Sequence, residues 1–164
     1  MTTSTPDRPS VLDLLHTVVD DGSFLSWDEP LVEVATDEAY AATLARARER
    51  SGLDESVLTG TGLVHGRSVA LIGCEFGFLA GSIGVAAAER LVSAVERATT
   101  EGLPLLATTA SGGTRMQEGT TAFLQMVKIA PLSPRIKQRV FPTRCISGIR
   151  RPAGCSPPGA RSAT

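Results

Sequence analysis

The chain has 164 residues and a mass of 17.1 kDa, which suits one domain or a part of a larger one. Its hydrophobic content of 42% is sufficient for a core, and no apolar run is long enough to span a membrane. Aromatic residues make up only 4% of the sequence, too few for the base-stacking surface of a nucleic-acid-binding module. The three cysteines form no Cys-x-x-Cys pair, which argues against a zinc site or a disulfide framework. The N-terminus lacks the regions of a signal peptide, so we expect a cytoplasmic protein.

The net charge of −1 hides two segments of opposite charge. Residues 1–130 hold 9 Lys and Arg against 17 Asp and Glu, a balance of −8, whereas residues 131–164 hold 7 basic residues and no acid. The basic segment also contains 6 of the 10 prolines and has no hydrophobic period. It is interpreted either as a disordered tail that binds an acidic partner or as sequence from a shifted reading frame, with the second favoured by its composition. Residues 1–10 are expected to be a disordered leader.

Four elements are predicted in the first half of the chain. The apolar repeat over 11–19 indicates a short amphipathic helix, and the Ala-, Arg- and Glu-rich run over 36–51 indicates a second helix. Residues 56–64 and 68–74 alternate and are rich in β-branched side chains. Because His65-Gly66-Arg67 separates these two runs, they predict a hairpin.

A glycine-rich stretch, residues 75–84, follows the predicted hairpin. Glycines at 77, 81 and 84 permit backbone to approach other backbone or a ligand closely. The apolar period over 85–99 predicts a helix, and the apolar run over 105–109 predicts a buried strand. The expected order is therefore strand, strand, helix, strand, glycine turn, helix.

The turn Ser111-Gly112-Gly113-Thr114 joins the last strand to the last helix. Paired glycines let the backbone come close to a ligand, and their N–H groups beside a helix N-terminus suit an anion or an oxyanion. A glycine-rich turn with no ligand is the alternative that spacing alone leaves open.

Residues 111–119, SGGTRMQEG, followed by FLQM at 123–126, resemble the signature of biotin-dependent carboxyltransferases. The resemblance is nearest to the beta-type half of acetyl-CoA carboxylase carboxyltransferase and covers about residues 11–130. It implies an α/β, crotonase-like fold in which ββα units coil around one core. Residues 11–130 would then be the N-terminal part of a carboxyltransferase domain, truncated or frameshifted after about residue 130.

The resemblance implies transfer of a carboxyl group from carboxybiotin to acetyl-CoA, giving malonyl-CoA for fatty acid synthesis. This reaction passes through an enolate, which backbone donors stabilise. The implied catalytic groups are the backbone N–H groups of Gly112 and Gly113, and the implied substrate-binding residues are Ser111, Thr114, Arg115, Gly81 and Ser82. For Arg115, its spacing of three from Glu118 favours a local pair that braces the turn over direct substrate contact.

By the same resemblance, no cofactor or metal is bound directly, and biotin on its carrier protein and acetyl-CoA act as substrates. The implied partners are an alpha-type carboxyltransferase half, the biotin carboxyl carrier protein and biotin carboxylase, with no nucleic acid and no membrane. Arg46, Arg48 and Arg50 form either a solvated helix face or a contact to the phosphates of an acyl-CoA. The solvated face is favoured because alternate positions do not share one side of a helix.

Three other functions compete with this one. One is a catalytically inactive fragment with residual acyl-CoA or partner binding. A crotonase-type hydratase is the nearest other enzyme, but it needs carboxylates after the glycine turns, where Glu118 is the one candidate. A hydrolase nucleophile at Ser82 is excluded because His16 and His65 both precede it, whereas that class places its histidine after the serine.

Overall fold

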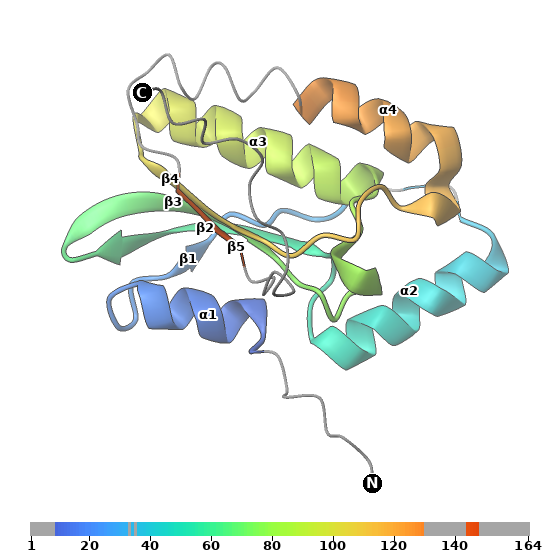
Figure 1. The fold of residues 1–164 in the computed structure, drawn as a ribbon, viewed down its shortest axis with the longest axis horizontal. Helices are drawn as coiled ribbons and strands as arrows, with labels where there is room; N and C mark the ends of the chain where they lie inside the picture. The colour runs from blue at the N-terminus through green and yellow to red at the C-terminus, as the bar shows by residue number, and fades with distance from the viewer. Residues whose placement is uncertain (1–8, 33, 35, 130–143, 148–164) are drawn as a thin grey trace, which may run out of the picture.

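The computed structural model describes residues 9–32, 34, 36–129 and 144–147 (Figure 1). Its centre is a five-stranded sheet in the order β1-β2-β3-β4-β5. β1, β2 and β3 are antiparallel to one another, whereas β4 is parallel to β3 and β5 is parallel to β4. The strands are β1 Leu25–Ser26, β2 Val57–Val64, β3 Arg67–Cys74, β4 Leu105–Thr109 and β5 Arg144–Ser147.

Helices lie on both sides of this sheet (Figure 1). α3 and α4 are on one side, and α1 and α2 are on the other (Figure 1). Among the helices in the described part of the chain, none is long and apolar enough to cross a membrane. The helices are α1 Val11–Val18, α2 Glu38–Ser51, α3 Val85–Glu101 and α4 Gly119–Ile129, with short 3₁₀ turns η1 Leu79–Gly81 and η2 Met116–Glu118.

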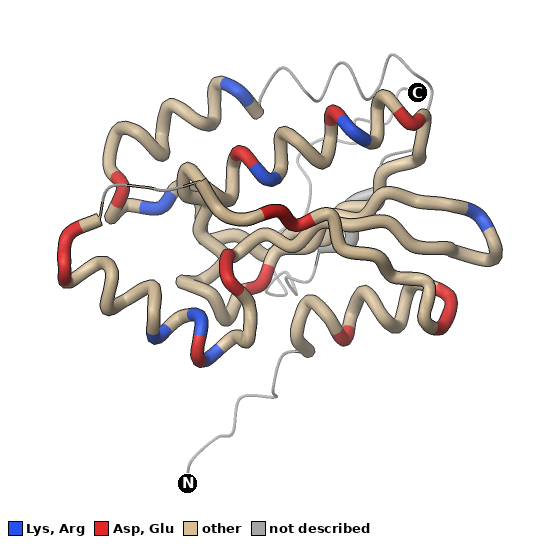
Figure 2. The backbone as a smooth tube through the Cα atoms, turned by 180° about the vertical axis from the view of Figure 1, so that it is seen from behind, with Lys and Arg blue, Asp and Glu red and all other residues tan. Residues whose placement is uncertain are grey.

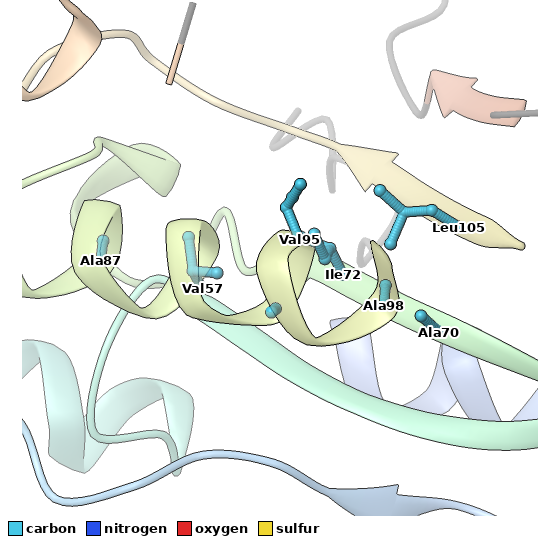
Figure 3. Packing of buried hydrophobic residues seen from close by; sticks show 8 residues of the cluster. Val57, Ala70, Ile72, Ala87, Val95, Ala98 and Leu105 are labelled. Atoms are coloured by element: carbon cyan, nitrogen blue, oxygen red, sulfur yellow. The ribbon is translucent and has the colours of Figure 1, made fainter. Parts of the chain in front are cut away.

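The core is split between the two faces of the sheet by the alternation of strand side chains. In β3, Ala70 and Ile72 are buried in a cluster with α3, whereas Leu71 between them is buried in a cluster with α1. Figure 3 shows the α3 cluster, in which small residues such as Ala98 let the helix lie close to the strands. Burying a side chain such as Leu71 contributes about 1.5–3 kcal/mol, so these clusters hold the helices on the sheet.

The predicted helices and hairpin are confirmed with small shifts at their ends. α2 begins after Asp37, whose side chain accepts a hydrogen bond from the Tyr40 N–H, and ends at Gly52 with a φ of 70°. The hairpin turns at His65 and Gly66, both with positive φ, which is the turn geometry that matches strand twist. The Asp20 carboxylate accepts from both N–H groups of that turn, at 3.1 and 2.7 Å.

Two features of the fold were missed by the sequence patterns. β1 is only two residues long, too short to show any period. Arg90 lies in the middle of α3 with 8% exposure, and its guanidinium donates to the Asp54 carboxylate and to the carbonyl oxygens of Val57 and Glu29. Arg90 therefore holds the segments on both sides of α2 against α3, although sequence spacing gave no sign of an ion pair there.

The predicted basic tail, residues 131–164, lies outside the described residues except at 144–147. Those four residues form β5, which pairs with β4 from Leu106 to Thr109. Regular structure here differs from the expected disorder, and its physical reason is the edge of β4, which presents a row of backbone groups to any added strand. The predicted leader over residues 1–10 is described only at residues 9 and 10, where Ser10 caps α1.

Candidate functional site

The two glycine-rich loops predicted to form the site lie against each other. The Gly112 N–H donates to the Ala80 carbonyl at 2.8 Å, and the Ile83 N–H donates to the Gly113 carbonyl at 2.8 Å. Ile83 and Thr114 form an isolated parallel bridge. The turn after β4 and the loop after β3 are therefore joined along their backbones, as expected where two neighbouring parallel strands end at the same edge.

Close contact between two backbone segments explains why residue 81 is a glycine. Its φ is 66°, and a Cβ atom there would overlap the carbonyl oxygen of Ala110. Leu79 and Ala80, just before it, also have positive φ values of 45° and 56°. Such conformations cost about 1–3 kcal/mol each in non-glycine residues and cluster at functional sites, so η1 is the strained part of this site.

The N–H groups of Gly112 and Gly113 both have internal acceptors in this structure. The Gly112 N–H donates to the Ala80 carbonyl, and the Gly113 N–H donates to the Ser111 hydroxyl at 3.1 Å. Ser111, Gly112 and Gly113 are exposed, and a Cβ atom at Gly113 would have no atom within 4 Å. The turn is accessible to a ligand, and the role of these N–H groups as oxyanion donors stays a prediction.

Arg115 does not point into this accessible space. It is only 1% exposed, and its guanidinium forms a two-armed ion pair with the Glu55 carboxylate. The same group donates to the carbonyl of Ser82 at 2.7 Å. Burial lowers the pKa of the Arg115 guanidinium, but the hydrogen bond and charge of Glu55 outweigh burial, so the pKa rises. Substrate binding by Arg115 is not supported by these contacts, which correspond to the bracing role that its spacing favoured.

Ser82 takes part in the same buried network. Its carbonyl accepts from the Ser56 hydroxyl at 2.8 Å as well as from Arg115, and its own hydroxyl accepts from the Arg115 Nε at 3.3 Å. Ser82 is half-buried. The structure thus places Ser82 at the predicted site, where Ser56 and Arg115 hold it by hydrogen bonds. Its substrate-binding role stays a prediction.

Glu118 connects the signature to the start of α3. Its carboxylate accepts from the Val85 N–H at 2.6 Å, and a Cβ atom at Gly84 would overlap it. An acid at this place suits the positive end of α3. The predicted pair with Arg115 is present at 3.4 Å, but Glu55 is the nearer partner of Arg115. A Cβ atom at position 84 would therefore displace the Glu118 carboxylate from the Val85 N–H.

Tyr40 and Glu55 are site residues that sequence reasoning did not assign. The Tyr40 hydroxyl donates to Glu118 at 2.5 Å, and burial followed by this hydrogen bond raises the pKa of Tyr40 to about 12. Glu55, Tyr40, Arg115 and Glu118 are among the residues that line a cavity of about 400 Å³, and most of its other lining residues are apolar. No short motif links these residues, because Tyr40 and Glu118 are 78 positions apart.

The arginines of α2 make backbone contacts. Arg46 and Arg48 donate to the carbonyls of Ala42 and Asp54, and Arg50 donates from Nε to the Gly77 carbonyl at 3.1 Å. Figure 2 shows basic and acidic residues side by side along this helix. This arrangement agrees with the solvated face favoured from the spacing. Within the described residues, no group of three or more His, Cys, Asp or Glu side chains is placed to hold a metal ion.

Comparison with known proteins identifies the family. The model of the carboxyl transferase domain family matches residues 10–154, farther than the signature motifs extend. A probable biotin-dependent acyl-coenzyme A carboxylase beta3 subunit from Mycobacterium tuberculosis is 65% identical over 117 residues, which cover 71% of this chain and 24% of that protein. The acetyl-coenzyme A carboxylase carboxyl transferase subunit beta 2 of Roseiflexus castenholzii is 40% identical over 146 residues, covering 80% of this chain and 48% of that one.

Solved structures show the same fold. A transcarboxylase 12S structure matches with a TM-score of 0.71 at 23% identity, over 83% of this chain and 25% of that one. The beta subunit of geranyl-CoA carboxylase from P. aeruginosa matches with a TM-score of 0.64 at 16% identity, over 84% of this chain and 24% of that one. The predicted crotonase-like α/β class is confirmed, although the chain spans only between 24% and 48% of the length of these proteins. The chain belongs to the carboxyl transferase domain family.

Proposed function

We propose that this chain is part of an acyl-CoA carboxylase carboxyltransferase that moves a carboxyl group from carboxybiotin to acetyl-CoA. The observation that carries the proposal is the family signature at an exposed glycine turn, residues 111–114, within the matched domain. Acetyl-CoA is the first candidate acceptor because relatives at 40% identity are acetyl-coenzyme A carboxylase subunits. The relatives at 65% identity are called acyl-coenzyme A carboxylase subunits, so a longer acyl group is the competing acceptor.

The chemistry sets what the site has to supply. The bond between the carboxyl carbon and the biotin ureido nitrogen breaks and releases CO2, and that nitrogen takes a proton from the acetyl methyl group. The resulting enolate carbon attacks the CO2 and forms malonyl-CoA. Negative charge develops on the thioester oxygen, where backbone N–H donors stabilise it by roughly 3–4 kcal/mol each. No side-chain base is required of this chain.

Among the candidate donors, the Gly113 N–H is the more available. Its acceptor in this structure is an exposed side chain, the Ser111 hydroxyl, which can rotate away. The Gly112 N–H donates to the backbone of the strained residue Ala80. An enolate oxygen would replace Ser111 Oγ at Gly113, while Gly112, Gly81 and Thr114 hold the turn in place.

The partners follow from the same proposal. Carboxybiotin arrives on a biotin carboxyl carrier protein after loading by a biotin carboxylase, and an alpha-type half completes the transferase. The relatives are named as subunits, which supports an assembly of several chains. Malonyl-CoA made by it would serve fatty acid synthesis.

Isothermal titration of the full chain with acetyl-CoA, propionyl-CoA and free CoA tests the binding step. Gly113→Ala should weaken acetyl-CoA binding, because alanine disfavours the φ of 97° and shifts the N–H group. Gly22→Ala is the matched control, since Gly22 also has a positive φ of 68° and open space around it but lies far from the turn in sequence. Equal affinities for acetyl-CoA and free CoA would contradict the proposal.

Acyl-CoA binding without transfer is the second candidate. The observation behind it is that the aligned part covers about a quarter of the M. tuberculosis relative. Mixing the chain with acetyl-CoA and a carboxybiotin donor, then measuring malonyl-CoA by mass spectrometry, separates the two candidates. Malonyl-CoA above the uncatalysed level supports transfer by this chain, and binding without malonyl-CoA supports the second candidate.

A further inference from the structure

Tyr40 links helix α2 to both loops of the site. It is the only tyrosine of the chain and is 7% exposed. Its hydroxyl donates to the Glu118 carboxylate at 2.5 Å and accepts from Arg115 Nη1 at 3.4 Å. One hydroxyl therefore contacts both charged side chains of the family signature.

Glu118 also contacts the start of α3. Its other carboxylate oxygen accepts from the Val85 N–H at 2.6 Å, where α3 begins after the glycine-rich loop. Glu118 itself lies in η2, directly after the turn 111–114. The orientation of this carboxylate therefore affects how the turn lies relative to the start of α3.

Arg115 completes the connection. Its Nη1 donates to Glu55 at 2.9 Å and to Tyr40 and Glu118 at 3.4 Å each. Its Nη2 donates to the Ser82 carbonyl. Without the Tyr40 hydroxyl, Glu118 Oε1 keeps only the long contact to Arg115, and Glu118 is then drawn toward the guanidinium. That movement would pull on the Val85 N–H and on the turn together.

The side chains of Tyr40, Arg115 and Glu118 are buried together beside a cavity. Tyr40, Arg115 and Glu118 border the cavity of about 400 Å³, and the buried side chains of α2 are only Tyr40 and Ala47 among its described residues. Because these polar groups are buried and weakly screened, their mutual hydrogen bonds decide where the Glu118 carboxylate lies.

We propose that Tyr40 is a positioning residue: its hydroxyl holds Glu118 between Val85 and Arg115 and thereby sets the turn 111–114 against the loop that carries Ser82, without touching the substrate. The consequence for acyl-CoA rests on the proposed function, whereas the position of the loops is a property of the free protein. The two are therefore tested separately.

The test compares Tyr40→Phe with Thr43→Val in the full chain. Thr43 is a half-buried residue of the same helix whose hydroxyl donates to the Ala39 carbonyl, so the control also removes one hydroxyl from α2. Amide hydrogen exchange, followed by NMR, is read at Gly112, Val85 and the core residue Leu71. We expect Tyr40→Phe to speed exchange at Gly112 and Val85 about fivefold, with Leu71 unchanged, and Thr43→Val to change none of them.

Equal exchange at Gly112 and Val85 in wild type and Tyr40→Phe overturns the proposal. So does an equal acceleration at Gly112 and Leu71, because that is the result of a hydroxyl that only stabilises the whole fold. If Tyr40→Phe does not fold, Glu118→Gln takes its place, since it keeps the side-chain size and loses the charge. Unchanged amides in a folded Glu118→Gln likewise overturn it.

Acetyl-CoA titration gives the second readout. If wild type binds acetyl-CoA, Tyr40→Phe should raise the dissociation constant about fivefold, and Thr43→Val should leave it unchanged. If wild type binds no acyl-CoA, the proposed function fails, and the exchange at Gly112 and Val85 alone decides the role of Tyr40.

Discussion

Arg115 is the side chain through which the buried part of the site is held together. It contacts Glu55 and Ser56 just before β2 and Ser82 in the loop after β3. A buried charge of this kind is stable only while its partner is present, because removing one partner leaves the other ion without solvent or countercharge. Arg115 therefore matters to folding as much as to the turn that carries it.

Arg115→Ala should lower the free energy of unfolding by about 3–5 kcal/mol, because it leaves the Glu55 carboxylate buried and unpaired. Lys128→Ala is the control: Lys128 forms an exposed ion pair with Glu89, and such pairs contribute about 0.2–1 kcal/mol. Urea unfolding followed by the fluorescence of Trp27, the single tryptophan, measures both. Similar losses in the two variants would refute the structural importance of the Arg115 pair.

Ionisation of Tyr40 makes the free energy of unfolding depend on pH in the alkaline range. Its pKa of about 12 in the folded protein lies above the ordinary 10.0, because burial and the Glu118 hydrogen bond disfavour the phenolate. The folded state thus holds the proton more tightly than the unfolded state, so this stabilisation is complete below pH 10 and is lost as the pH rises toward 12. The loss amounts to at most about 3 kcal/mol for a shift of this size.

Ultraviolet titration of the single tyrosine measures this directly. We expect the folded chain to form tyrosinate at higher pH than the urea-unfolded chain, and Tyr40→Phe to show a smaller fall in stability over the same range. Titration of the folded chain at the ordinary pKa would show that Tyr40 is neither buried nor bonded to Glu118 in solution.

At the scale of elements, the two glycine-rich loops are shaped by contact between backbones. Gly81 in η1 lies against Ala110 after β4, and Gly112 in the turn lies against Ala80. Each loop therefore adopts its conformation only when the other loop is in place. This mutual dependence explains why strained residues persist in η1.

Gly81→Ala should cost clearly more than Gly102→Ala, although both residues have nearly the same φ, 66° and 68°. Gly102 ends α3 with nothing within 4 Å of an added Cβ, so alanine there costs about 1–2 kcal/mol from the left-handed conformation alone. At Gly81 the added carbon overlaps the Ala110 carbonyl, which adds about 1–3 kcal/mol. Urea unfolding measures both costs, and equal costs would mean that the loops are not in contact.

At the scale of the whole molecule, α4 leaves an apolar face uncovered. Phe123, Leu124 and Val127 are 63%, 57% and 66% exposed, while Ala122 and Gln125 are buried toward the molecule. The helix is joined to α3 by an ion pair between Lys128 and Glu89. Exposed apolar patches of this kind promote association in solution.

The full chain should therefore self-associate as its concentration rises, and the double variant Phe123→Gln, Val127→Gln should do so less. Thr121→Gln, at another exposed position of α4, is the control and should behave as wild type. Light scattering after size-exclusion chromatography gives the mass across a range of concentrations. The same mass for wild type and the double variant would show that this face does not drive association.

Local patterns were sufficient for most elements and for the family. Helix periods, the alternation in β2 and β3 and the turn residues His65 and Gly66 act between neighbours in the chain, so their effects are visible in sequence. The signature over 111–119 likewise identified the family without a structure. Whether residues 131–164 are in frame stays a prediction that the DNA sequence tests.

Only the tertiary structure decided how the site is held. Glu55 pairs with Arg115 across 60 positions and Tyr40 with Glu118 across 78, distances at which no periodic pattern records a contact. It also showed that Gly81 contacts Ala110 and that Gly84 contacts Glu118. The sequence alone allowed either protein backbone or a ligand to lie against these glycines. The sequence by itself determined the elements and the ancestry, because these depend on local preferences and matching residues. The roles of Arg115, Glu118 and Tyr40 depend on which groups share one buried, weakly screened volume, and folding alone brings them there.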